Sequence, residues 1–525
     1  MTDVTDLTAN APRLSDLSDR ERSARFAQLQ ERLVPVWEAM RRNQPGESIV
    51  VLPSVTPDET QDSATVQALE ERFLFLLFLL RQPRLQVIYV TGRPVPESII
   101  EYYLGLLPGV IPRHARRRLH MVATHDGSRR SLAEKVLSRP RVVSQIRALI
   151  PDARLCHLVP YSTSERERDV ALVLGVPLYG ADPALLPFGT KTGCRRLFAD
   201  ADVMHPLGHE DLRDVDGLVD ALTDMRVQRP GMRYAIVKLN DGVSGRGNAT
   251  VDLADLPAPG AADEAGELRR RIEAMAFEQE DITLAGYLGQ LARDAGVVEE
   301  RVVGAEIRSP SVQLRVTPLG EVELLSTHDQ LLGGPSGQKY LGCRFPADFG
   351  YAQAITGEAA KIGAALAREG VLGRFAVDFV VVRSGSGTWT PYAIEVNLRK
   401  GGTTHPFLTL QFLTDGRYDP VTALFMAPGG REKHLVATDH LESEVLRGLT
   451  VDDLFDVAVR HRLHFDQARQ TGVVFHMMSA LTELGRVGFT AVGDTPDQAD
   501  ATYRRAERIL LDEAGPQPEA VLPAV

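Results

Sequence analysis

The stretch that decides the fold is FAVDFVVVRSGSGTWTPYAIEVN, which runs from Phe375 to Asn397. Two apolar runs rich in β-branched and aromatic residues flank the loop Ser384–Gly387, a pattern typical of two antiparallel strands joined as a hairpin. A symmetric hairpin sets Asp378 roughly opposite Glu395, although like charges that face each other across a ladder repel. Carboxylates within apolar runs persist only if a positive charge lies between them. The hairpin therefore predicts a cation site.

Asn397 adds a third ligand to this site. Side chains alternate along a strand, so Glu395 and Asn397 share one face, and their oxygens converge with those of Asp378. Two carboxylates and one amide suit a hard divalent cation. We expect Asp378, Glu395 and Asn397 to bind Mg²⁺ that bridges the phosphates of a nucleotide.

The composition is that of a globular enzyme. The 525 residues are 44% apolar and 25% charged, which is ordinary for such a chain and enough for about three domains. A net charge of −11 argues against a nucleic-acid binder. The three cysteines have no metal-binding spacing and predict reduced thiols in a cytoplasmic protein. The apolar run Phe73–Leu80 is far shorter than the ~20 residues that span a bilayer, so it predicts a buried helix and no membrane association.

Four regions are expected along the chain. Strand-like and helical segments alternate over residues 1–185, which predicts a doubly wound α/β domain with a parallel sheet. Shorter strands with tight turns then predict two α+β lobes, at 186–305 and 306–430. Residues 431–525 predict a small α+β region that ends in a helix.

The segment Asp241–Gly247 is a candidate phosphate-binding loop, although it is not a Walker A motif. A glycine-rich turn lets backbone amides approach phosphate closely but is a weak signal by itself. Lys238 on the strand that enters the loop strengthens the signal, and Lys191 at the head of an earlier helix adds a second cation. The loop residues expected to contact phosphate are Gly242, Ser244, Gly245 and Gly247.

Other polar segments are ambiguous when each is taken alone. The backbone of Val298–Glu306 could hydrogen-bond an adenine edge and a carboxylate there could bind ribose, but an exposed strand edge is the simpler interpretation. Arg399 and Lys400 lie next to paired glycines and hydroxyls, which indicates an anion site beside the metal. Arg315 and Arg374 are further candidates for neutralising phosphate charge, although a single arginine is more often part of a surface ion pair.

Together these features resemble the ATP-grasp fold, and within it the carboxylate–amine ligases such as D-alanine:D-alanine ligase. Four local motifs resemble the peptide ligases of the pheganomycin biosynthesis type more narrowly. They are GTKTG at 189–193, SPSVQ at 309–313, EVNLRKGGTTHP at 395–406 and GVVFHM at 472–477. The resemblance covers about residues 150–500. It implies a two-lobed ATP-grasp fold between the N-terminal doubly wound domain and the small C-terminal region.

The resemblance also implies an activity. In this family a carboxylate attacks the γ-phosphate of ATP, and an amine then displaces phosphate from the acyl phosphate to form an amide. Lys191 and Lys238 would contact the phosphates, and Glu299 and Glu306 would contact the adenine and the ribose. Asp378, Glu395 and Asn397 would hold Mg²⁺. The residues assigned to catalysis are Lys238, Arg315 and Arg399. The cofactors are then ATP and Mg²⁺, and the substrates are amino acids or small peptides.

Two alternatives stay open. Another ATP-grasp chemistry, such as phosphorylation of a hydroxyl or ligation to a thiol, would use the same metal and phosphate residues. A non-catalytic nucleotide-binding protein would be expected to have lost Asp378, Glu395 or one lysine. The identity of the substrates is not legible in the sequence. The loop 331–339 is either part of a substrate pocket or a plain surface loop. Many relatives dimerise, so a homodimer is also an open alternative.

Overall fold

The computed structural model describes residues 13–55, 61–241, 247–279, 282–333, 337, 339–385 and 387–515. The chain divides into two compact units. The first unit comprises Met1–Pro183, Leu408–Gly416 and Asp439–Val525, and the second comprises Ala184–Phe407 and Arg417–Thr438. The finer boundaries expected at 305 and 430 stay predictions.

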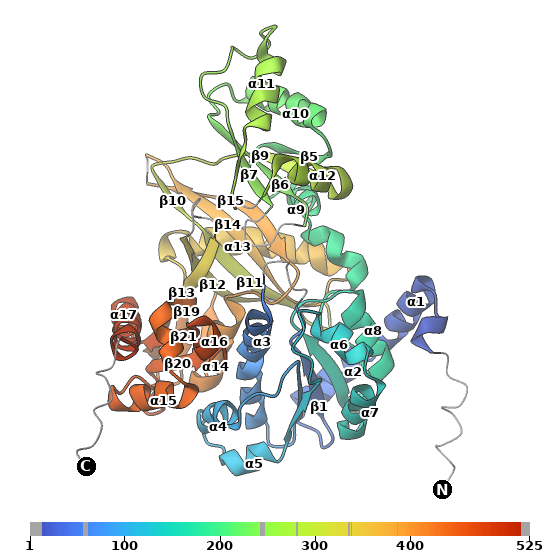
Figure 1. The fold of residues 1–525 in the computed structure, drawn as a ribbon, viewed down its shortest axis with the longest axis vertical. Helices are drawn as coiled ribbons and strands as arrows, with labels where there is room; N and C mark the ends of the chain where they lie inside the picture. Colours follow the sequence, from blue (N-terminus) through green and yellow to red (C-terminus); the bar gives the residue numbers. More distant parts are fainter. Residues whose placement is uncertain are drawn as a thin grey trace, which may run out of the picture. The chain divides into compact units, whose positions relative to one another are not determined.

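The first unit contains a four-stranded parallel sheet in the order β3-β2-β1-β4. Its strands are β1 (Ser48–Leu52), β2 (Gln86–Thr91), β3 (Leu119–Ala123) and β4 (Cys156–Pro160). Helices cover both faces. Val50, Ile88 and Leu158 pack against apolar residues of α1, α6, α7 and α8, whereas the Tyr89 hydroxyl on the other face donates to the carbonyl of Glu70 in α3. The doubly wound architecture predicted for the N-terminal region is therefore confirmed (Figure 1).

The helices of this region are short and alternate with the strands. They are α1 (Asp19–Gln30), α2 (Leu33–Arg41), α3 (Ser63–Glu71), α4 (Glu97–Gly105), α5 (Pro112–Arg116), α6 (Leu132–Leu137), α7 (Pro140–Leu149) and α8 (Glu165–Leu174), with the 3-10 helices η2 (Leu14–Asp16), η3 (Arg72–Arg81) and η4 (Ala153–Leu155). The apolar run Phe73–Leu80 is buried almost throughout, as predicted, but it forms the 3-10 helix η3 rather than an α-helix. Among the described residues, no helix has the length and apolar character needed to cross a membrane.

The C-terminal part of the first unit is α+β, as expected. Strands β20 (Gly472–His476) and β21 (Arg486–Gly493) pair antiparallel. The helical elements around them are η6 (Glu444–Gly448), α15 (Val451–Arg460), α16 (Ala480–Leu484) and α17 (Pro496–Glu513). Two elements cross from one unit to the other along the chain, namely α14 (Thr404–Thr414) and β19 (His434–Glu442).

The second unit begins near η5 (Pro183–Gly189) and holds a five-stranded sheet in the order β5-β9-β6-β7-β8. The strands are β5 (Gly208–Leu212), β6 (Tyr234–Leu239), β7 (Asn248–Asp252), β8 (Ala276–Phe277) and β9 (Gly296–Glu300). Helices α9 (Lys191–Asp200), α10 (Val215–Gln228), α11 (Glu264–Glu273) and α12 (Leu284–Asp294) surround it (Figure 1). Leu222 and Met225 of α10, Leu268 of α11 and Leu291 of α12 share its apolar core.

A larger antiparallel sheet completes the second unit. The strands that this unit contributes are β10 (Glu306–Arg308), β11 (Pro310–Val316), β12 (Val322–Gly333), β13 (Lys339–Phe345), β14 (Gly373–Arg383) and β15 (Trp389–Asn397), in the order β10-β14-β11-β12-β13 with β15 paired to β14. The small strands β16 (Arg417–Asp419), β17 (Leu424–Ala427) and β18 (Arg431–Glu432) form a separate three-stranded sheet. One face packs against α13 (Phe349–Arg368): a side chain at Gly363 would collide with Leu314 and Val322. The two α+β lobes predicted from the sequence are these two sheets with their helices.

Candidate functional site

The hairpin of β14 and β15 has the register expected from its symmetry. Asp378 pairs directly with Glu395, and a bulge follows Asp378. The side-chain amide of Asn397 donates to Oδ2 of Asp378 at 2.9 Å, so these two predicted ligands are in contact. Gln330 on β12 donates from Nε2 to the other oxygen, Oδ1, at 3.0 Å. Gln330 was not anticipated, because the order of the strands within a sheet cannot be read from spacing in the sequence.

The charge on Asp378 is costly without a cation. Burial and the neighbouring Glu395 raise the pKa of Asp378 to about 6, although a hydrogen bond from Ser311 and the charges of Arg399 and Lys191 act in the opposite direction. Two facing carboxylates with the side-chain amide of Asn397 beside them supply the oxygen ligands that a hard divalent cation prefers. Asp378, Glu395 and Asn397 therefore stay the candidate Mg²⁺ ligands.

Lys191 links helix α9 to the hairpin. Its Nζ lies 2.6 Å from Oε1 of Glu395. Burial opposes the charged amine, but the charge of Glu395 prevails and raises the pKa of Lys191. In the same way burial opposes ionisation of Glu395, yet Lys191 and Arg399 lower its pKa. The two predicted residues thus form an ion pair at the site.

The start of α9 explains why Lys191 is held there. Thr190 caps the helix by accepting a hydrogen bond from the backbone of Gly193 at 3.0 Å, which satisfies an otherwise free helix amide. A Cβ at Gly193 would collide with the carbonyl oxygen of Pro187, so this position needs glycine. The backbone N–H of Thr192 donates to the side chain of Asn240 at 2.9 Å. The GTKTG motif therefore fixes the start of α9 and with it the position of Lys191.

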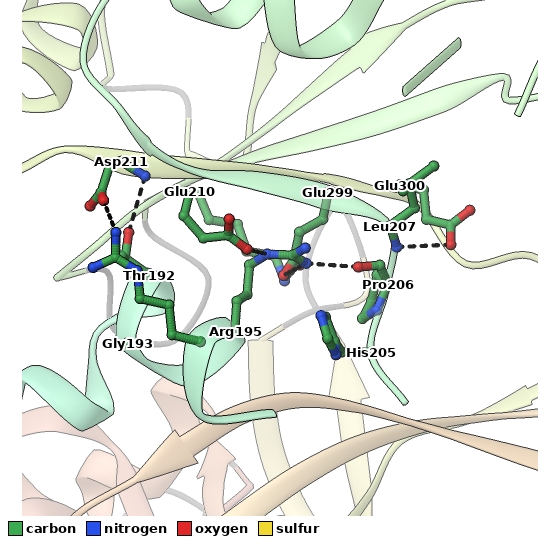
Figure 2. Close-up of polar contacts among 12 residues, drawn as sticks. Thr192, Gly193, Arg195, His205, Pro206, Leu207, Glu210, Asp211, Glu299 and Glu300 are labelled. Atoms are coloured by element: carbon green, nitrogen blue, oxygen red, sulfur yellow. Dashed lines mark hydrogen bonds and ion pairs between the residues drawn. The ribbon is translucent and has the colours of Figure 1, made fainter. Parts of the chain in front are cut away.

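Lys238 and Glu299 bind each other within the smaller sheet. They lie on the adjacent antiparallel strands β6 and β9 and form a buried ion pair. Arg195 of α9 also contacts Glu299, with Nη1 3.0 Å from Oε1, and its Nε lies 2.6 Å from Oε1 of Glu210. Figure 2 shows the guanidinium of Arg195 between Glu210, Glu299 and the carbonyl of Pro206, to which it donates at 2.7 Å.

This network explains the ionisation of Glu299. Burial disfavours its negative charge, but Lys238 and Arg195 together hold the pKa of Glu299 below its usual range. Arg195 was missed in the sequence, although a signal existed. Lys191 and Arg195 are four residues apart on one helix and so share a face.

Of the predicted arginines, Arg399 lies near the hairpin carboxylates and Arg315 does not. Arg399 lies two residues after Asn397, and its positive charge acts to lower the pKa of Glu395 and opposes the rise in the pKa of Asp378. Arg315 lies on β11 opposite Arg374 and pairs through Nε with Glu323 at 2.7 Å. Along β11 it is four residues, about 13 Å, from the position paired with Asp378. Arg315 is thus on the same sheet but away from the carboxylates.

Glu306 is also set apart from the hairpin carboxylates. It pairs with Arg383 in the register of β10 and β14, five residues beyond Asp378. Its carboxylate lies 2.6 Å from Arg308 and 3.2 Å from Arg383. A ribose contact at Glu306 stays a prediction.

Of the four loop residues expected to contact phosphate, only Gly247 is described. Gly247 is buried, and its carbonyl accepts hydrogen bonds from Leu239 and from the hydroxyl of Tyr287, each at 2.9 Å. The loop therefore has a fixed end between β6 and β7. Gly242, Ser244 and Gly245 lie outside the described residues.

The region that contains these residues matches a known protein family. Residues 185–285 and 276–420 match the family described as IQCH-like, ATP-grasp. Residues 185–420 therefore have the ATP-grasp fold. Residues 453–506 match the PGM1 C-terminal domain. The chain is also similar in fold to the biotin carboxylase–β,γ-ATP complex from Campylobacter jejuni, with a TM-score of 0.54 and 12% identity over 90% of this chain and 95% of that one.

Two curated relatives of this chain differ in how much of their own length the match covers. An L-propargylglycine–L-glutamate ligase from Streptantibioticus cattleyicolor is 29% identical over 460 residues, which are 86% of this chain and 90% of the relative. The IQ motif-containing protein H of Danio rerio is 25% identical over 343 residues, 57% of this chain but only 32% of that protein. The resemblance to ATP-grasp ligases predicted from the sequence is confirmed by these matches.

Proposed function

We propose that this chain joins a carboxylate to an amine with the conversion of ATP to ADP and phosphate. The observation that carries the proposal is the convergence of Asp378 and Asn397 in contact, Glu395 opposite them, and Lys191 on Glu395. The relative from Streptantibioticus cattleyicolor supports amino acids as substrates, because it is a ligase of L-propargylglycine and L-glutamate.

The reaction has two steps. An oxygen of the substrate carboxylate forms a bond to the γ-phosphorus, and the bond from that phosphorus to the β,γ-bridging oxygen breaks, so ADP leaves with the electron pair. The amine nitrogen then forms a bond to the acyl carbon, phosphate leaves, and the amine loses a proton. Neither step needs a nucleophile from the protein.

The residues of the site fit the demands of the first step, which depends on position and on neutralised charge. Lys191 and Arg399 place positive charge next to Glu395 and Asp378, where the γ-phosphate would lie. Mg²⁺ bound by Asp378, Glu395 and Asn397 would neutralise further charge on the phosphates. Lys238 would contact phosphate from the smaller sheet.

The glycine loop and the nucleoside contacts are part of the same proposal. Gly242, Ser244, Gly245 and Gly247 would donate to phosphate, with Glu299 near the adenine and Glu306 at the ribose. Arg315 is proposed to assist catalysis through its charge. A cytoplasmic location and a homodimer are also our predictions, and light scattering of the purified protein tests the second.

The proposal is tested by incubating the protein with Mg-ATP, single amino acids or small peptides, and hydroxylamine as a general amine. Release of ADP and phosphate with formation of a hydroxamate is the expected result and identifies the activated acid. Release of AMP and pyrophosphate would overturn the acyl-phosphate route. A phosphorylated hydroxyl or a thioester would assign another ATP-grasp chemistry, and ATP binding without any product would assign a non-catalytic role.

A further inference from the structure

A pocket of about 380 Å³ lies in the N-terminal region of the first unit. The ends of β2 and β3 line it, together with residues of α4, α5 and α7. Open parallel sheets bind their ligands beyond the carboxyl ends of the strands, which is where this pocket is found. None of its residues is among those assigned to ATP or Mg²⁺, so the pocket is a candidate for a separate binding site.

The pocket adjoins the edge strand of the parallel sheet. In the described part of the chain, β3 is the outermost strand and pairs only with β2. The carbonyl of Arg118 accepts a hydrogen bond from β2 at 2.9 Å, and the amide of Thr124 donates to the carbonyl of Thr91 at 2.8 Å. Backbone groups alternate in direction along a strand, so the even-numbered residues of β3 bind β2. The backbone groups of Met121 and Ala123 therefore point to the outer edge.

This outer edge is occupied at its start and open farther along. Nη1 of Arg116 on α5 donates to the carbonyl of Leu119 at 3.2 Å, as the alternation requires. Met121 and Ala123 make no outward backbone hydrogen bond to any described residue, and both line the pocket. An open strand edge supplies the donors and acceptors that an extended peptide needs to pair with a sheet.

The charged side chains of the pocket leave one guanidinium available. Glu97 on α4 neutralises Arg116 through both of its oxygens, at 2.8 Å from Nε and 3.2 Å from Nη2. Arg141 on α7 is exposed and makes no ion pair or hydrogen bond with a described residue. Gln145 lies one helical turn farther on, so its amide shares that face of α7 and also lines the pocket. A guanidinium next to an amide suits a carboxylate.

We propose that this pocket binds the carboxyl-terminal end of a short peptide. The carboxylate binds Arg141, and the last peptide amide pairs with the outer edge of β3. Ile100 of α4 and Val142 of α7 add apolar walls, so the last side chain of the peptide is apolar. The volume lies near the lower end of the ~300–1,000 Å³ range of ligand pockets, which suits a peptide of few residues. This inference does not rest on the proposed ligase activity.

The test measures binding to the full chain by calorimetry, without ATP or Mg²⁺. The probes are N-acetyl-L-alanyl-L-leucine and N-acetyl-L-alanyl-L-phenylalanine. Each is used in three forms: the free acid, the carboxamide, and the acid methylated on the nitrogen of its last amide. The carboxamide lacks the charge for Arg141, and the methylated form lacks the N–H that pairs with the strand edge.

Four variants locate the binding in the pocket. Arg141→Met removes the guanidinium, Arg141→Lys retains a positive charge, and Gln145→Glu places a carboxylate where it repels that of the peptide. Both positions are exposed, so the fold should persist. Arg113→Met is the matched control, because Arg113 is exposed on α5 but does not line the pocket.

We expect at least one free acid to bind the wild type at least tenfold more tightly than its carboxamide and its methylated form. The preference for the acid over the carboxamide should disappear in Arg141→Met and Gln145→Glu. It should return in part in Arg141→Lys and persist in full in Arg113→Met. No binding of either acid, equal binding of acid and carboxamide, or a preference that survives in Arg141→Met would overturn the proposal.

Hydrogen–deuterium exchange then tests the pairing with the strand edge. A saturating concentration of the preferred acid should slow exchange at the amides of Met121 and Ala123 in the wild type. The same concentration should leave exchange unchanged in Arg141→Met. Binding of the acid to the wild type without slower exchange at these amides, or equal binding of the methylated form, would overturn the pairing with β3.

Discussion

Two carboxylates in the second unit have opposite ionisation behaviour. Glu299 is buried between Lys238 and Arg195, and its pKa is lowered despite burial. Asp378 is half-buried opposite Glu395, and its pKa is raised to about 6. Loss of solvent acts to raise the pKa of both, so the charge of the neighbours decides the direction. Glu299 is already neutralised by the protein, whereas Asp378 is suited to a cation from outside it.

The largest expected effect follows from removing charge at the hairpin. Asp378→Asn and Glu395→Gln should each lower the rate of ADP release at least about 100-fold, because preorganised charge at the transferred phosphoryl group is lost. Asp378→Asn should leave the fold intact, since it removes one of two repelling carboxylates. Glu395→Gln also leaves the buried Lys191 without its partner and should lower the unfolding free energy as well. Steady-state ADP release measures the first effect, and circular dichroism checks the second. Wild-type rates in both variants would remove these residues from the metal site.

At Glu299 the expected effect is on stability rather than on the rate of ADP release. Glu299→Gln leaves Lys238 and Arg195 buried without their shared carboxylate, and breaking a buried pair from one side costs about 3–5 kcal/mol of unfolding free energy. Urea denaturation followed by the emission of Trp389, in a Trp37→Phe background, reports on this unit because the chain has only 2 tryptophans. Unchanged stability would mean that the network around Arg195 is not needed for folding.

The buried His328 shows the effect of burial on a pKa when no neighbouring charge opposes it. His328 packs against Phe345 and Phe407, and burial lowers its pKa to about 3. Its folded pKa lies below the unfolded value of about 6.5, so the stability from neutral His328 is present above pH 6.5 and is lost as the pH falls toward 3. The loss is about 1.4 kcal/mol for each pH unit in that window. Urea denaturation at pH 6.5 and pH 5 should show this slope reduced in His328→Phe, and an identical slope would contradict the assignment.

The smallest effect is expected at Glu306. Its ion pairs with Arg308 and Arg383 are largely exposed, and such pairs contribute about 0–1 kcal/mol. Glu306→Gln should therefore leave the unfolding free energy nearly unchanged and serve as the control for Glu299→Gln. The KM for ATP in the same variant tests the predicted ribose contact. An unchanged KM would argue against that contact.

The register of the hairpin could be predicted because it depends only on residues that are close together in the sequence. The position of the Ser-Gly loop sets the register, and alternation puts Glu395 and Asn397 on one face. The ion pair of Lys191 with Glu395 could not be predicted, because it joins a helix and a strand about 200 residues apart in sequence. The same holds for Lys238 and Glu299. Each was predicted to contact ATP, but only the pairing of β6 with β9 brings them together.

The position of Arg374 and Asp378 on a single strand has a consequence for how this part of the chain can change. A one-residue insertion between them would turn the following side chains, Asp378 included, toward α13. We therefore expect related chains to keep the length of β14 between these positions constant and to differ there by substitution.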